Sequence, residues 1–232
     1  MLWPLAAAAQ SGPQSVPQQI AQPPRQSDRQ ELDRMLDEIR AAIHAGDWRE
    51  AWLLTFKLNG AITTIRTQSG GFSPGLELAH LEMVAGKDAI TRAPQLPRLA
   101  RAAYAAHDFS KAASYAREAL EAAQHGEFPW TGDAIHEGNI VLGRLAYQNG
   151  DVPGAIGYLL AAGKTPGSAT LASLGPNMGL ARDLLLGGQS AAVIQYLEEC
   201  KAFWITGAQK LAEWLALTHA GLSPEFGANV DY

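Results

Sequence analysis

Apolar residues recur at steps of three and four along most of the chain. Between Ser27 and Gly46, the apolar positions that share one helical face are Leu32, Met35, Leu36, Ile39 and Ile43. This period is typical of an amphipathic α-helix, and Ser27 with Gln30 has capping-box spacing at its start. No window alternates apolar and polar residues between hairpin turns, as a half-buried strand would. The pattern therefore predicts an all-α fold.

Helical segments follow one another in pairs joined by short turns. In the first pair, Gly46 is expected to end one helix and Asp47 to begin the next. The later pairs are predicted at 96–106 with 109–123, at 134–149 with 152–162, and at 177–186 with 190–203. Their joins are His107-Asp108, Gly150-Asp151 and Gly187-Gly188. A recurring unit of helix, turn and helix indicates a repeat array.

The third pair carries the clearest pattern. Its small and apolar contact positions are Leu142, Gly143, Ala146, Gly150, Ala155, Leu159 and Ala162, followed by Pro166. This spacing resembles the tetratricopeptide (TPR) repeat, which has small residues where two helices touch and a glycine at the turn. The resemblance implies an antiparallel helix-pair solenoid, a right-handed superhelix with a concave face. The repeats are degenerate, because their turns are unevenly spaced whereas a regular TPR recurs about every 34 residues.

The remaining segments set the domain limits. An insertion at 58–93 is predicted to hold one or two extra helices that begin near Ser73-Pro74. The repeat domain is predicted to cover 27–221, with a helix at 205–220 capping the array. Residues 222–232 are expected to form a loose tail.

Residues 1–26 are predicted to form a disordered leader. Residues 1–9 are apolar and end in small residues, like the end of a secretory signal, and residues 10–26 are rich in Gln, Pro and Ser. This pattern favours an exported or periplasmic protein over a cytoplasmic one. The alternative is an alanine-rich tail with no targeting role.

Composition narrows the classes of function. The 232 residues are 47% hydrophobic, which is typical of a globular chain. The net charge of −5 argues against a nucleic-acid partner, whose phosphates need basic side chains. The single cysteine, Cys200, excludes an internal disulfide and is predicted to be a buried thiol. No apolar run is long enough to span a bilayer, so no integral membrane segment is expected.

No constellation of catalytic residues is present. The segment 163–165 resembles the end of a phosphate-binding loop, but the first glycine of that motif is missing and no strand precedes it. The six histidines lack metal-ligand spacing, and the serines lack the context of a nucleophile elbow. The sequence therefore predicts a protein that is not an enzyme and has no metal or cofactor.

Four arginines occupy equivalent positions in the predicted pairs, each six residues before its turn residue: Arg40, Arg101, Arg144 and Arg182. In TPR-like units this position faces the concave groove, and Tyr104 and Tyr147 lie three residues further along. Guanidinium groups bind carboxylates through paired hydrogen bonds. These six residues are therefore predicted to bind an acidic or carboxylate-bearing peptide. The alternative is that the arginines are solvated or pair with local acids, namely Asp37, Glu137 and Asp183.

The function predicted from these features is a non-catalytic protein-interaction module that binds a peptide or partner segment. One alternative is a structural or oligomerisation solenoid without a peptide groove. Another is a small-ligand accessory domain with a pocket formed by Trp130, His136 and Asn139, because loop aromatics such as Trp130 often serve in binding. Trp48 and Trp52, one helical turn apart, are predicted to pack between helices.

Overall fold

The computed structural model describes residues 26–68, 74–86, 88–126 and 128–230. Within these ranges every regular element is a helix, so the predicted all-α class is confirmed. Of the predicted leader, only Gln26 is among the described residues. Ser73 and residues 231–232, which belong to the predicted insertion and tail, also lie outside them. No helix in the described ranges is both long and apolar enough to cross a membrane.

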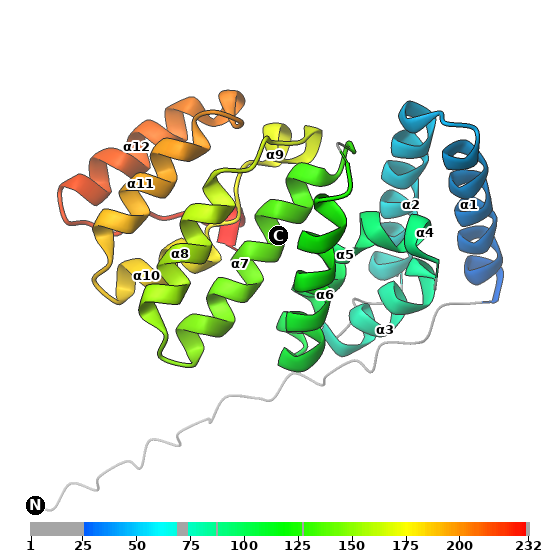
Figure 1. Ribbon diagram of the computed structural model, residues 1–232, viewed down its shortest axis with the longest axis horizontal. Coiled ribbons are helices and arrows are strands. Elements are labelled where there is room, and N and C mark those ends of the chain that lie inside the picture. The colour runs from blue at the N-terminus through cyan, green and yellow to red at the C-terminus, as the bar shows by residue number, and fades with distance from the viewer. Residues whose placement is uncertain (1–25, 69–73, 87, 127, 231–232) are drawn as a thin grey trace, which may run out of the picture.

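Most helices follow one another in chain order along the long axis of the molecule, whereas the short helix α9 lies beside α7 (Figure 1). The first half contains α1 (Gln26–His44), α2 (Trp48–Gln68), α3 (Pro74–Ala85), α4 (Ala89–Arg92), the 3-10 turn η1 (Ala93–Gln95), α5 (Leu96–Ala105) and α6 (Phe109–Ala123). The second half contains α7 (Thr131–Gln148), α8 (Val152–Gly163), α9 (Ala169–Leu174), α10 (Gly179–Leu186), α11 (Ser190–Cys200), η2 (Ile205–Gly207), α12 (Ala208–His219) and η3 (Gly227–Val230). Successive helices form the largest contacts, including α1 with α2, α5 with α6 and α7 with α8.

The four predicted turns share one backbone geometry. Their turn residues have positive φ angles: 73° at Gly46, 59° at His107, 79° at Gly150 and 79° at Gly188. In each turn, the next residue donates its N–H to a carbonyl in the helix just ended, as Asp151 does to Ala146 at 2.9 Å. This hydrogen bond is that of a Schellman cap, which favours glycine at the left-handed position. The predicted helix ends at these turns are therefore confirmed.

The interior consists of two hydrophobic clusters that meet at α7. The first holds buried residues from α1 to α7, and the second holds buried residues from α7 to η3. α7 contributes Val141 and Leu142 to the first cluster and Ile140 to the second. Cys200 is buried in the second cluster, as predicted, and burial raises the pKa of its thiol.

The predicted insertion contains α3 and α4, but α2 continues past residue 58 to Gln68 before the insertion begins. α3 packs on α5, and α1 contacts both α3 and α4. Within the described residues, α1 is the one helix on which α2 packs closely. Among the described residues, no second helix packs as closely on α2.

The expectation of a loose tail at 222–232 is wrong for its central part. Phe226 and Val230 are buried, and the Phe226 ring lies 5.1 Å from that of Trp214. The Asn229 amide donates to the carbonyls of Leu174 and Pro176 at 3.0 and 3.1 Å. Two apolar side chains and one asparagine therefore anchor this segment to the α9–α10 connection.

Candidate functional site

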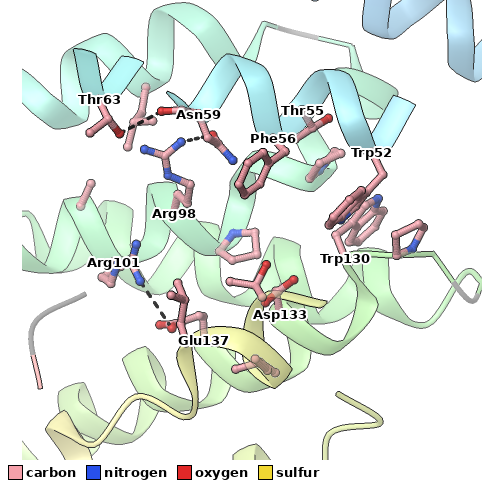
Figure 2. A pocket seen from close by; sticks show the side chains of 18 of the residues that line it. Trp52, Thr55, Phe56, Asn59, Thr63, Arg98, Arg101, Trp130, Asp133 and Glu137 are labelled. Atoms are coloured by element: carbon pink, nitrogen blue, oxygen red, sulfur yellow. Dashed lines mark hydrogen bonds and ion pairs between the residues drawn. The ribbon is translucent and has the colours of Figure 1, made fainter. Parts of the chain in front are cut away.

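A cavity of about 590 Å³ lies between α2, α5, α7 and α9 (Figure 2). One face of α2 forms its first wall, through residues at helical spacing that include Trp52, Phe56 and Asn59. Phe56 is 69% exposed and Trp48 is 43% exposed. The prediction that Trp48 packs between helices is therefore wrong, since almost half of it remains open to solvent. Large exposed rings gathered on one helix face are typical of a binding surface.

Two arginines on α5 form the basic part of the opposite wall. Arg98 and Arg101 lie one helical turn apart and both line the cavity. The Arg98 guanidinium donates to the side-chain oxygen of Asn59, which links α5 to α2 across the cavity. Arg101 Nη1 lies 3.6 Å from Glu137 Oε1 on α7.

Two carboxyl groups on α7 complete the polar lining. Asp133 and Glu137, also one turn apart, both line the cavity. Burial raises the pKa of Asp133 to about 6, although the Ser168 hydroxyl donates to it at 2.8 Å. Burial raises the pKa of Glu137 to about 7 against the opposing effect of Arg101. Each group therefore changes charge near neutral pH, as groups in binding and catalytic clefts often do.

Aromatic rings cover one end of the cavity. The Trp130 ring stacks on Phe128, with centroids 5.0 Å apart and an interplanar angle of 4°. The Phe128 ring in turn lies 5.2 Å from that of Trp48, which joins the start of α7 to the start of α2. Trp52 stacks on Phe56 at 6.1 Å.

The predicted arginine series occupies equivalent positions, but each of its members lies beside an acid. Arg40 Nη1 is 2.8 Å from Asp37, and Arg144 Nε is 3.2 Å from Asp183. Arg182 lies 3.4 Å from Asp183, and Arg101 contacts Glu137 as described above. The contacts thus match the alternative of pairing with local acids. Two of these pairs join one helix pair to the next: α5 to α7 and α7 to α10.

Of the six predicted groove residues, only Arg101 lines the cavity. The Arg144 guanidinium lies 4.5 Å above the Tyr104 ring, whose hydroxyl accepts a hydrogen bond from Gln148 at 2.6 Å. Tyr147 is packed against the second core cluster, and its hydroxyl lies against Gly187. The predicted groove residues thus line this cavity only through Arg101, while Tyr104, Arg144 and Arg182 are linked to one another by the ring contact and by Asp183.

The three residues of the predicted small-ligand pocket, Trp130, His136 and Asn139, do not meet at this cavity. Trp130 lines the cavity, whereas His136 and Asn139 are buried and absent from its lining. The N–H of Asn177 donates to His136 Nε2 at 3.0 Å, so the neutral ring carries its proton on Nδ1, 3.2 Å from the Ala162 carbonyl. Burial lowers the pKa of His136 to about 4. These side chains stabilise the interior of α7 and do not face a ligand space.

Sequence reasoning missed Phe56, Arg98 and Asp133. The signal available for α2 was the spacing of Trp52, Phe56 and Asn59 along one face, but an apolar helix face has the same pattern when it is buried. Within the described part of the chain, no group of three or more His, Cys, Asp or Glu residues could hold a metal ion. No family model matches this chain, and no curated protein or solved structure shows a significant match to it.

Proposed function

We propose that this chain is a non-catalytic interaction module that holds a peptide segment of a partner protein in the cleft between α2, α5 and α7. The observation that carries the proposal is the exposed aromatic face of α2, which lies opposite the arginines of α5 across the cavity. Such a face is energetically unfavourable in water and favourable once an apolar side chain covers it.

The lining indicates the chemistry of the peptide. Trp52 and Phe56 provide apolar surface for a hydrophobic side chain of the peptide. Arg98 and Arg101 provide guanidinium groups for a carboxylate, either an acidic side chain or the chain terminus. The proposed partner segment is therefore acidic or carboxylate-bearing with an apolar anchor, as in other groove-binding modes.

We also propose that the helix pairs form a short TPR-like solenoid with degenerate repeats. The packing of helices in chain order and the shared geometry of the four turns support this arrangement. In this proposal the insertion of α3 and α4 separates α2 from α5, and the cleft results from that separation.

A small-molecule ligand is the second candidate. The cavity volume of about 590 Å³ falls within the range of about 300–1,000 Å³ that is typical of small-ligand pockets. Its lining, aromatic rings with a few charged groups, is also typical of such sites.

Peptide binding to the full chain tests the main proposal. The probes are fluorescein-labelled ten-residue peptides that contain one aromatic residue and end in either a free carboxylate or an amide. We expect the free-carboxylate peptides to bind, and Arg98→Gln and Phe56→Ser each to weaken binding at least tenfold in fluorescence polarisation. Circular dichroism checks that the variants remain folded, as expected for Phe56, which is 69% exposed.

The matched controls remove the same chemistry elsewhere. Arg34→Gln removes an exposed guanidinium on α1, and Ile205→Ser removes an apolar side chain that is 71% exposed and outside the cavity. Equal affinities for the cavity variants and the controls would contradict the proposal. Concentration-dependent self-association without peptide binding would instead favour the structural or oligomerisation alternative.

A further inference from the structure

The cavity has two chemically different ends. Figure 2 shows Arg98 and Arg101 on the side away from Trp52 and Trp130. The carboxylate of the proposed peptide accounts for the arginine end only, because at the other end the ionised Asp133 would repel it. The aromatic end therefore requires a different chemical group from the occupant.

Aromatic faces dominate this second end. Trp52 and Phe56 contribute stacked rings from α2, and Trp130 contributes a ring from the residue that precedes α7. All three side chains line the same cavity as Asp133, and Figure 2 shows the four around its right-hand part. The faces of aromatic rings carry partial negative charge and attract organic cations.

Asp133 adds a carboxylate that is held in place. The Ser168 hydroxyl donates to Asp133 Oδ1 at 2.8 Å and fixes the carboxyl group. The Arg101 guanidinium forms its ion pair with Glu137, one turn further along α7, and its charge also opposes the effect of burial on the pKa of Asp133. Burial removes hydration from the charged form of Asp133 and raises its pKa, and a cation placed beside it would stabilise that form.

We propose that Trp52, Phe56, Trp130 and Asp133 form a subsite for an alkylammonium group, such as the lysine side chain of a bound peptide. This inference rests on the proposed function, since the same peptide would place its carboxylate at Arg98. The two charged ends fix its direction, because the arginines repel the ammonium group and Asp133 repels the carboxylate. The partner segment therefore carries a lysine side chain as well as a carboxylate.

A small organic cation tests the subsite independently of any peptide. The probes are choline chloride and its neutral isostere 3,3-dimethylbutan-1-ol, titrated into the full chain while the indole N–H signals are followed by NMR. Trp52→Phe and Trp130→Phe assign those two signals. We expect choline to shift both, with at least tenfold higher affinity than the isostere.

Asp133→Asn is the decisive variant, because it retains the oxygen that accepts from Ser168 and removes the charge. It should reduce choline affinity at least tenfold, whereas Glu121→Gln, an exposed carboxyl on α6, should leave it unchanged. Equal affinity for choline and the isostere, or no effect of Asp133→Asn, overturns the subsite. If the subsite fails this test but acidic peptides still bind through Arg98, the proposed function is retained without the subsite. If choline binds but the peptides do not, the subsite is retained and the proposed function is contradicted.

Discussion

Gly132 at the start of α7 lies against the backbone of Gly167 in the segment between α8 and α9. A Cβ atom added to Gly132 would overlap the carbonyl oxygen of Gly167. Thr165 in the same segment donates its hydroxyl to the Gly132 carbonyl at 2.8 Å. This close approach holds the connection to α9 beside Asp133, and therefore fixes one wall of the cavity.

Replacing Gly132 by alanine should strongly destabilise the protein. The obstructing atoms belong to backbone, so the α8–α9 connection must move to accept the methyl group, and we expect a loss of about 3 kcal/mol in the free energy of unfolding. Urea denaturation measures this loss. The control is Gly157→Ala, an exposed helical position with open space around it, which should stabilise the protein by up to about 1 kcal/mol. Equal effects of the two substitutions would show that the close approach has no energetic importance.

Replacing His107 by glycine should increase stability. His107 has a φ of 59° and is the one residue other than glycine with positive φ among those described. Glycine adopts this conformation without steric strain, so we expect a gain of about 1 kcal/mol, reduced by loss of the His107 contact with Phe109 at 5.7 Å. The reciprocal variant, Gly150→Ala, should lose a similar amount, since Gly150 has open space but a φ of 79°. Thermal unfolding of both variants measures the two changes, and a lower melting temperature for His107→Gly would contradict this account.

Removing the charge of Asp183 tests the ion pairs between helix pairs. Asp183 accepts contacts from both Arg144 and Arg182, and its side chain and that of Arg144 are each about one-fifth exposed. We expect Asp183→Asn to lower the free energy of unfolding by about 1 kcal/mol without changing peptide affinity. The matched change Glu198→Gln breaks an exposed pair with Lys201 and should alter stability by less than about 0.5 kcal/mol. Equal effects would mean that the pair contributes nothing beyond a surface contact.

Glu137 should make stability fall as pH rises toward neutrality. Its pKa is about 7 in the folded protein and 4.5 ordinarily, so between these values the folded state binds more protons than the unfolded state. The free energy of unfolding then decreases with rising pH through this window. The groups that face its carboxyl are Arg101 from α5, Asp133 and Arg144 from α7, and Asn177 after α9.

The difference between the wild-type protein and Glu137→Gln isolates this contribution. His136 acts in the opposite direction, because its pKa of about 4 destabilises the fold as pH falls below about 6.5. Urea denaturation of both proteins at several pH values from 5 to 8 should therefore show the extra downward slope only in the wild type. Parallel profiles would contradict a proton held by Glu137.

The helix pairs could be predicted because their ends depend on local chemistry. Gly46, Gly150 and Gly188 adopt the left-handed conformation that glycine allows, and the apolar spacing between turns marks the buried faces. The position of the arginine series could be predicted for the same reason. The sequence offered Asp37, Glu137 and Asp183 as partners for these arginines, but only the packing of the helices decides that Arg101 meets Glu137 and Arg144 meets Asp183.

The cavity could not be predicted, since it depends on where α2 lies relative to α5 in the folded chain. Phe56 and Leu58 are both apolar residues of α2, yet Phe56 is 69% exposed and Leu58 is fully buried. The order of the C-terminal segment is also a tertiary effect, because Asn229 bonds to carbonyls more than fifty residues away.

The attachment of α2 has a mechanical consequence for the cleft. α2 packs most closely on α1, and α1 contacts α3 and α4. Buried residues of both α1 and α2, such as Leu36 and Leu58, belong to the first hydrophobic cluster. The width of the cleft at Phe56 and Arg98 therefore depends on the packing of the first hydrophobic cluster and on the hydrogen bond from Arg98 to Asn59.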